Sequence, residues 1–145
     1  MTKDRKVLKE YSIVILILAG LTLIRAIVDA CITGFDPSSV NVEGASETLV
    51  KVALIITFVL ALLLLIPDVY VGIKGIKEAS HPTGARAHII WSLIIAILYG
   101  IGVVSSTIDI CKGFSWNQLA SLANTVLNAC LFTIYYITAK KVAED

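Results

Sequence analysis

Four charged side chains lie within long apolar stretches: Arg25, Asp29, Asp68 and Asp109. Three of them, Arg25, Asp29 and Asp109, could form an ion pair or a binding site. Arg25 and Asp29 are four residues apart, so a helix places them on one face. An ionised side chain at bilayer depth costs roughly 2.5 to 3.5 kcal/mol on insertion scales and normally faces protein or water. Counted from Tyr11 at about 1.5 Å per residue, Arg25 lies about 21 Å into a hydrocarbon core of about 30 Å. Asp109 ends its own stretch at a similar depth, so we expect the three groups to meet.

A polar stripe accompanies these charges. Its residues recur at steps of four, three and four, which puts them on one helical face: Asn117, Ser121, Asn124 and Asn128. One interpretation is an outward-facing polar pocket shared with the three charges. The other is a structural network, in which Asn and Ser bond across helices and an Asp neutralises Arg25. The structural interpretation is favoured because the charges nearly balance and no ligand is needed.

Pro67 and Asp68 form a second candidate feature. A proline inside a helix removes one backbone hydrogen bond and predicts a kink, which marks either a gate or an inner helix end. Asp68 lies too far along its span to reach Arg25, and we expect Lys74 or the basic connector after it to pair with Asp68.

The cysteines and histidines favour no catalytic chemistry. Cys31 and Cys111 each follow an aspartate by two residues, and they are a candidate disulfide if their Cα atoms approach within about 7 Å; the alternative is two free, buried thiols. His81 and His88 lack further residues at metal-ligand spacing, so no metal is predicted. The sequence contains no recognisable catalytic motif, and neither an enzyme nor a cofactor is expected.

The composition indicates which elements position these residues. Of 145 residues, 57% are hydrophobic and 16% charged, and the mean hydropathy of +0.87 lies outside the soluble range. A net charge of +1 argues against nucleic-acid binding. Apolar runs predict helical spans at 11–32, 49–73, 87–111 and 119–138, separated by turn-rich connectors. The prediction is a single all-α transmembrane domain over 1–145, an integral membrane four-helix bundle.

Basic residues predict the orientation, because Lys and Arg are retained on the cytoplasmic side. Nine of them share the side of the two termini and the middle connector, and only Lys51 and Lys112 lie on the other. Both termini are therefore expected in the cytoplasm, with the chain in the plasma membrane. The residues expected to contact anionic lipid headgroups on the inner face are Lys74, Lys77 and Arg86. A cleaved signal peptide is rejected, because Arg25 interrupts the first apolar stretch and three spans would remain.

An offset of 80 residues superposes the first span on the third, matching Gly20 with Gly100, Asp29 with Asp109 and Cys31 with Cys111. Two tandem, parallel-repeat hairpins are one interpretation, and chance similarity between hydrophobic helices is the other. Small residues on the third span, at Ser92, Ala96 and Gly100, predict close helix packing or homodimerisation.

Three functions remain open. The favoured one is a non-enzymatic protein that acts by helix association, as a subunit, accessory or protective protein, with a second copy or another membrane protein as partner. The alternative is a small oligomeric transporter or channel that uses the outward polar pocket. A membrane thiol redox enzyme using Cys31 and Cys111 is the third.

Overall fold

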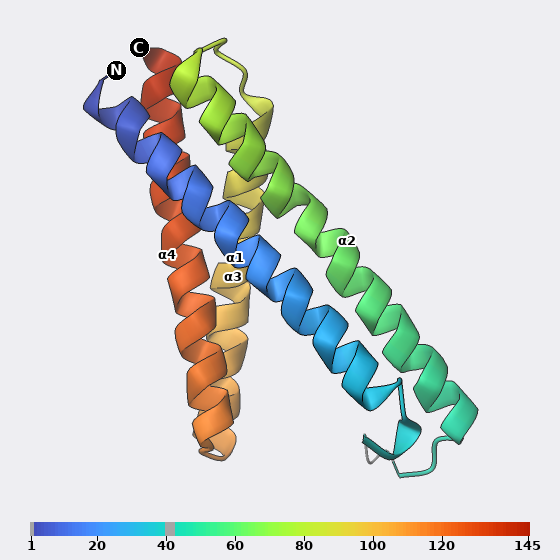
Figure 1. Ribbon diagram of the computed structural model, residues 1–145. Coiled ribbons are helices and arrows are strands. Elements are labelled where there is room, and N and C mark those ends of the chain that lie inside the picture. Colours follow the sequence, from blue (N-terminus) through green and yellow to red (C-terminus); the bar gives the residue numbers. More distant parts are fainter. Residues whose placement is uncertain (1, 40–42) are drawn as a thin grey trace. The chain divides into compact units, whose positions relative to one another are not determined.

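A computed structural model describes residues 2–39 and 43–145 of the chain. Within these ranges the structure is all-helical and contains no strand (Figure 1). Its elements are α1 (Lys3–Thr33), the short 3₁₀ helix η1 (Pro37–Ser39), α2 (Glu47–Ser80), α3 (Ala87–Lys112) and α4 (Trp116–Glu144). The predicted all-α class is confirmed.

Each of α1 to α4 is long and apolar enough to cross a membrane. The helices extend beyond the predicted spans: α2 continues to Ser80 and α4 to Glu144. At 1.5 Å per residue, the 34 residues of α2 extend about 51 Å, well beyond a hydrocarbon core of about 30 Å. An apolar run marks only the part of a helix that matches the hydrocarbon, whereas the helix continues while its N–H groups find carbonyls four residues back.

Local signals define where the helices start and stop. The hydroxyl oxygen of Ser46 accepts the Leu49 N–H at 3.3 Å, and that of Ser115 accepts the Gln118 N–H at 3.2 Å. Serine side chains thereby satisfy N–H groups that lack an intrahelical partner at the start of α2 and α4. α1 ends at Thr33 and is followed by Gly34, whose φ of +55° is a left-handed conformation that glycine adopts without a steric penalty.

The chain forms two compact units, which are described separately. Unit 1 comprises Met1–Leu16 and Pro67–Asp145, and unit 2 comprises Ile17–Ile66. In unit 1 the first part of α1 and the second part of α2 pack with α3 and α4. The core side chains recur at three- and four-residue steps, so each helix buries one face. The most deeply buried large ones are Leu8, Ile15, Val71, His88, Phe132 and Tyr135.

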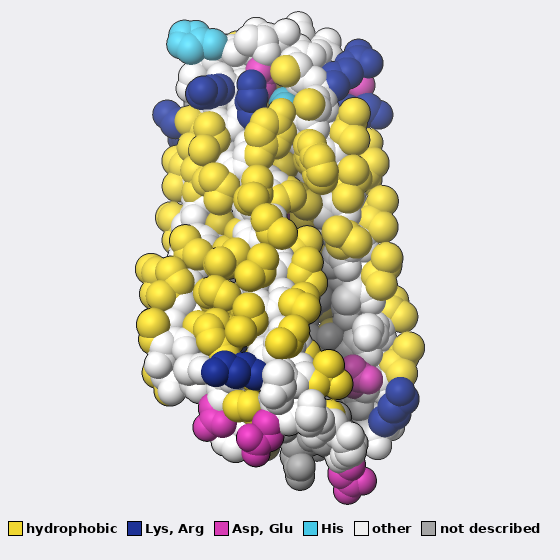
Figure 2. Space-filling view, turned by 90° about the vertical axis from the view of Figure 1, so that its right-hand side faces the viewer, with side chains coloured by type: hydrophobic (Ala, Val, Ile, Leu, Met, Phe, Trp, Pro, Cys, Tyr) yellow, Lys and Arg dark blue, Asp and Glu magenta, His cyan; other side chains and the backbone are white. Residues whose placement is uncertain are grey.

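One end of unit 1 is formed by the start of α1, the connector 81–86 and the end of α4 (Figure 1). We call it the basic end. Lysine and arginine side chains gather there, above a broad hydrophobic surface (Figure 2). This end holds the termini and connector that the sequence assigned to one side of the membrane; which side that is stays a prediction.

Unit 2 consists of the second part of α1, η1 and the first part of α2, and it has almost no core of its own. Among its described residues only Ala19 is buried. Phe35 and Phe58 contact each other edge to face, with ring centroids 5.4 Å apart. Large apolar side chains such as Leu64 and Ile66 are more than 60% exposed. Unit 2 therefore presents its apolar helices to the surroundings.

Candidate functional site

Buried polar side chains gather in unit 1, toward its basic end. We define the buried polar cluster as Ser12 on α1, Glu78 on α2, His88 on α3 and Tyr135 on α4. Each is at most 5% exposed. The four helices of unit 1 each contribute one member, so the cluster exists only where they pack together.

Two glycines of α2 allow the helices to approach at this point. A Cβ atom added to Gly75 would lie 2.1 Å from the Ser12 Oγ and 2.6 Å from the Tyr135 hydroxyl. A Cβ atom at Gly72 would lie 2.6 Å from the Leu16 Cγ. Small residues at helix contacts let backbones approach closely within membranes. Gly75 therefore makes the contact that brings α1, α2 and α4 together.

Tyr135 joins α4 to the backbone of α2. Its hydroxyl donates to the Val71 carbonyl oxygen at 2.9 Å, while Ser12 donates to the Leu8 carbonyl of its own helix at 2.7 Å. The Tyr135 ring meets the His88 ring edge to face, with centroids 6.2 Å apart. In an apolar interior each of these polar groups needs a partner, and the phenol finds one on a neighbouring helix.

Glu78 binds the connector between α2 and α3. Its Oε2 accepts the Thr83 N–H at 2.7 Å, and its Oε1 accepts the Thr83 hydroxyl. At the same end of α2, the Arg5 guanidinium donates to the carbonyl oxygens of Ala79 and Ser80 at 2.9 and 2.8 Å. A cation at these otherwise unpaired carbonyls also complements the negative end of the helix dipole. Two charged side chains thus fasten α1 and the connector to the end of α2.

His88 is the member of the cluster whose hydrogen-bonding groups are least satisfied. Its Nδ1 atom is buried and has no hydrogen-bond partner within the described residues. The described ranges contain no group of three or more His, Cys, Asp or Glu residues that could hold a metal ion. The cluster therefore combines an acid, an imidazole and a phenol in a packed helix junction.

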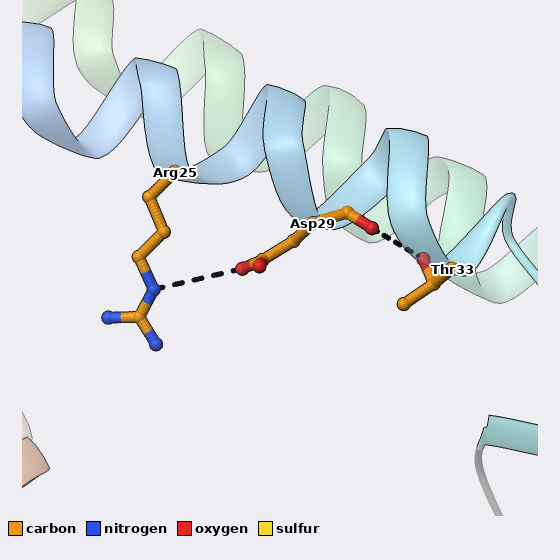
Figure 3. Close-up of polar contacts among 3 residues, drawn as sticks. All are labelled: Arg25, Asp29 and Thr33. Atoms are coloured by element: carbon orange, nitrogen blue, oxygen red, sulfur yellow. Dashed lines mark hydrogen bonds and ion pairs between the residues drawn. The ribbon is translucent and has the colours of Figure 1, made fainter.

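The three charges that were predicted to meet, Arg25, Asp29 and Asp109, are divided between the two units. Arg25 and Asp29 belong to unit 2, where Arg25 Nε lies 3.7 Å from Asp29 Oδ2, as the spacing of four predicted (Figure 3). Their side chains are 84% and 65% exposed, and the Asp29 carbonyl accepts the Thr33 hydroxyl at 2.8 Å. Asp109 belongs to unit 1 and is exposed. A meeting of all three groups stays a prediction.

The polar stripe of α4 lies in unit 1, and Asn117, Ser121 and Asn124 are exposed there. Asn128, which is half-buried, donates to the Asn124 carbonyl oxygen of its own helix at 2.9 Å. Asparagines one turn apart are close enough for this bond without any neighbouring helix. Both interpretations of the stripe, a pocket or a bonding network between helices, stay predictions.

The expected pairing of Asp68 with Lys74 is wrong. Within the described residues the ion pair of Arg25 with Asp29 is the only one. Residues six apart on a helix lie about 120° apart around its axis, so Lys74 cannot face Asp68. Asp68 is half-buried. α2 remains helical through Pro67, the first residue of its unit 1 part, and the gate at this position stays a prediction.

Cys31 and Cys111 are exposed free thiols that belong to different units, so the disulfide stays a prediction.

Lys77 and Arg86 are exposed and Lys74 is half-buried at the basic end, where contacts with headgroups also stay a prediction.

Sequence reasoning missed the buried polar cluster, because Ser12, Glu78, His88 and Tyr135 come from four separate segments and each is unremarkable alone. The spacing of Gly72, Gly75 and Ala79 could have indicated it. The prediction placed close packing on α3, where Ser92 is buried and a Cβ atom at Gly102 would lie 3.2 Å from the Thr125 Cγ2 of α4, whereas one at Gly100 would meet nothing within 4 Å.

Comparison with models of known protein families, with curated proteins and with solved structures found no match.

Proposed function

We propose that this membrane protein acts by association within the bilayer, as a subunit, accessory or protective partner of another membrane protein, and that the Arg25–Asp29 pair lies at the contact. The observation that carries the proposal is the exposure of this ion pair on a helix long and apolar enough to span a membrane, in a unit that has almost no core.

An exposed ion pair on such a helix loses the hydration that water would give it. Two ionised side chains facing lipid tails are costly even when paired. An ionised side chain costs roughly 2.5 to 3.5 kcal/mol at the bilayer centre, and the cost falls toward the boundary, so Arg25 carries more of it than Asp29. A spacing of 3.7 Å recovers part of this energy, but the exposed guanidinium keeps donors without acceptors among the described residues. A partner that presents polar groups would satisfy them.

Apolar side chains flank the pair along the same stripe of α1. Leu21 is 57% exposed and Ile32 is 78% exposed, four residues before and seven after Arg25. This spacing places both on the face of the ion pair. A polar centre with an apolar surround is the usual arrangement at protein contacts, where the surround excludes solvent.

Photo-crosslinking in the native membrane tests the proposal. A photoreactive amino acid at Leu21 or Ile32 is expected to join a second protein chain. The same group at Ile27, which is 46% exposed and lies on the opposite side of the helix, serves as the matched control. The double variant R25L/D29L is expected to abolish the adducts while the protein remains folded, because leucine inserts into lipid readily.

Three results would contradict association. Adducts within one chain would show that unit 1 covers the pair. Adducts with lipid alone would show that nothing covers it. Rapid labelling of Arg25→Cys by a membrane-impermeant thiol reagent would show a water-filled path, as the transporter alternative requires.

A further inference from the structure

A groove lies between α3 and α4 at the basic end of unit 1. It has a volume of about 330 Å³. The first turns of α3 form one wall through Arg86, Ile90 and Leu93, and the last turns of α4 form the other through Tyr136 and Lys140. The spacings of four and seven residues on α3 and of four on α4 put the lining on one face of each helix. The groove therefore follows from the antiparallel packing of α3 and α4.

Polarity changes along the groove. Arg86 precedes the first residue of α3, and Lys140 and Glu144 lie in the last turns of α4, so the charged lining residues are at one end of the groove, its mouth. Ile90 and Leu93 follow Arg86 by four and seven residues, which places them about 6 and 10 Å farther along the helix axis. Ile89, only 7% exposed, also lines the groove. A charged mouth thus leads onto an apolar floor that runs toward the membrane-spanning part of the helix.

We propose that this groove binds one anionic phospholipid, with the headgroup phosphate between Arg86 and Lys140 and the start of one acyl chain along Ile90 and Leu93. A guanidinium and an ammonium form strong, charge-assisted hydrogen bonds with phosphate. Basic pockets between membrane helices are a recurring mode of anionic lipid recognition. Because the lining lies on α3 and α4 of unit 1, the site is independent of the proposed contact around Arg25.

Charge complementarity favours an anionic phospholipid as the occupant of the groove. Glu144 also lines the groove, so the three ionised side chains of the lining sum to a single positive charge. A free phosphate would use the cations but leave Ile90 and Leu93 uncovered, whereas a lipid covers both regions. Tyr136 is half-buried in the wall, where its amphipathic ring suits the boundary between headgroups and acyl chains.

Native mass spectrometry of the purified full chain tests the site. The protein is incubated with equal amounts of phosphatidylglycerol and phosphatidylcholine, and one phosphatidylglycerol is expected to remain bound after detergent removal. The variant R86Q/K140Q is expected to lower its retention about thirtyfold, since each basic group near a membrane surface contributes roughly fivefold. K6Q/K9Q removes two exposed charges near the start of α1, at the same end but outside the groove lining, and it is expected to retain the lipid.

Two further variants separate a built site from general charge attraction. Ala143, a half-buried residue of the groove lining, is replaced by Phe to fill the apolar space without altering charge, and A143F is expected to lose the lipid. Glu144→Gln removes the negative charge and is expected to increase retention severalfold. Circular dichroism melting identifies any variant that fails to fold, and Ala143→Leu then replaces A143F.

The site is refuted if phosphatidylcholine is retained as well as phosphatidylglycerol, or if K6Q/K9Q loses the lipid as R86Q/K140Q does. Displacement of the lipid by millimolar inorganic phosphate would assign the groove to a soluble anion and overturn the proposal. A loss of lipid with intact crosslinking at Leu21 would separate this site from the proposed association.

Discussion

Replacing Gly75 by alanine probes the helix junction of unit 1 most directly. The added methyl group would lie 2.1 Å from the Ser12 Oγ, 2.6 Å from the Tyr135 hydroxyl and 2.7 Å from its Cε2 atom. Tyr135 is fully buried and its hydroxyl is bonded to Val71, so the ring cannot move away without breaking that bond. The methyl group must therefore push apart side chains from α1 and α4.

The expected change in the free energy of unfolding combines two destabilising contributions with one stabilising contribution. Overpacking a well-filled core typically costs about 1 to 3 kcal/mol, and a displaced hydrogen bond costs about 0.5 to 1.5 kcal/mol. Alanine regains about 1 kcal/mol because it favours the helix more than glycine does. We expect G75A to lower the free energy of unfolding by about 2 kcal/mol. In the S12A background, which removes the closest contact, the same change should cost about 1 kcal/mol less.

Reversible unfolding in mixed micelles, followed by far-ultraviolet circular dichroism, measures these differences. Gly100→Ala is the matched control, since Gly100 is also helical and a Cβ atom there meets nothing within 4 Å. It is expected to be neutral or stabilising by up to about 1 kcal/mol. If G75A proves as stable as G100A, or if S12A gives no rescue, the close approach at Gly75 does not exist as described.

Two further predictions concern the end of α2. Glu78→Gln keeps the shape but weakens the charge-assisted bonds from Thr83, so it should lower the free energy of unfolding by about 1 to 2 kcal/mol and speed proteolysis of connector 81–86; an unchanged cleavage rate would show that the carboxylate does not hold the connector. Arg5→Ala removes the donors to the Ala79 and Ser80 carbonyls and should cost about 1 to 2 kcal/mol in the same unfolding assay. Arg5→Lys should recover only part, because a lysine cannot reproduce the two-pronged geometry, and full recovery would assign the effect to charge alone.

Most of the helical architecture could be predicted from the sequence, because the thickness of a bilayer fixes how many apolar residues a span needs. The helix starts at Ser46 and Ser115 are local as well, since each serine bonds an N–H three residues ahead. The Arg25–Asp29 pair needs only one helix and a spacing of four, and it formed as predicted. Features that lie within one segment could thus be predicted from the sequence alone.

Tertiary packing alone decided where the buried polar chemistry lies. The bond from Tyr135 to Val71 joins residues 64 positions apart, and that from Arg5 to Ala79 joins residues 74 apart. Neither separation produces a periodic pattern in the sequence, because such partners depend on which helix faces pack together. The sequence itself determined four apolar helices and the charges at their ends. Only the folded structure decided that Gly75 lets three helices approach, and that α3 and α4 enclose a groove between Arg86 and Lys140.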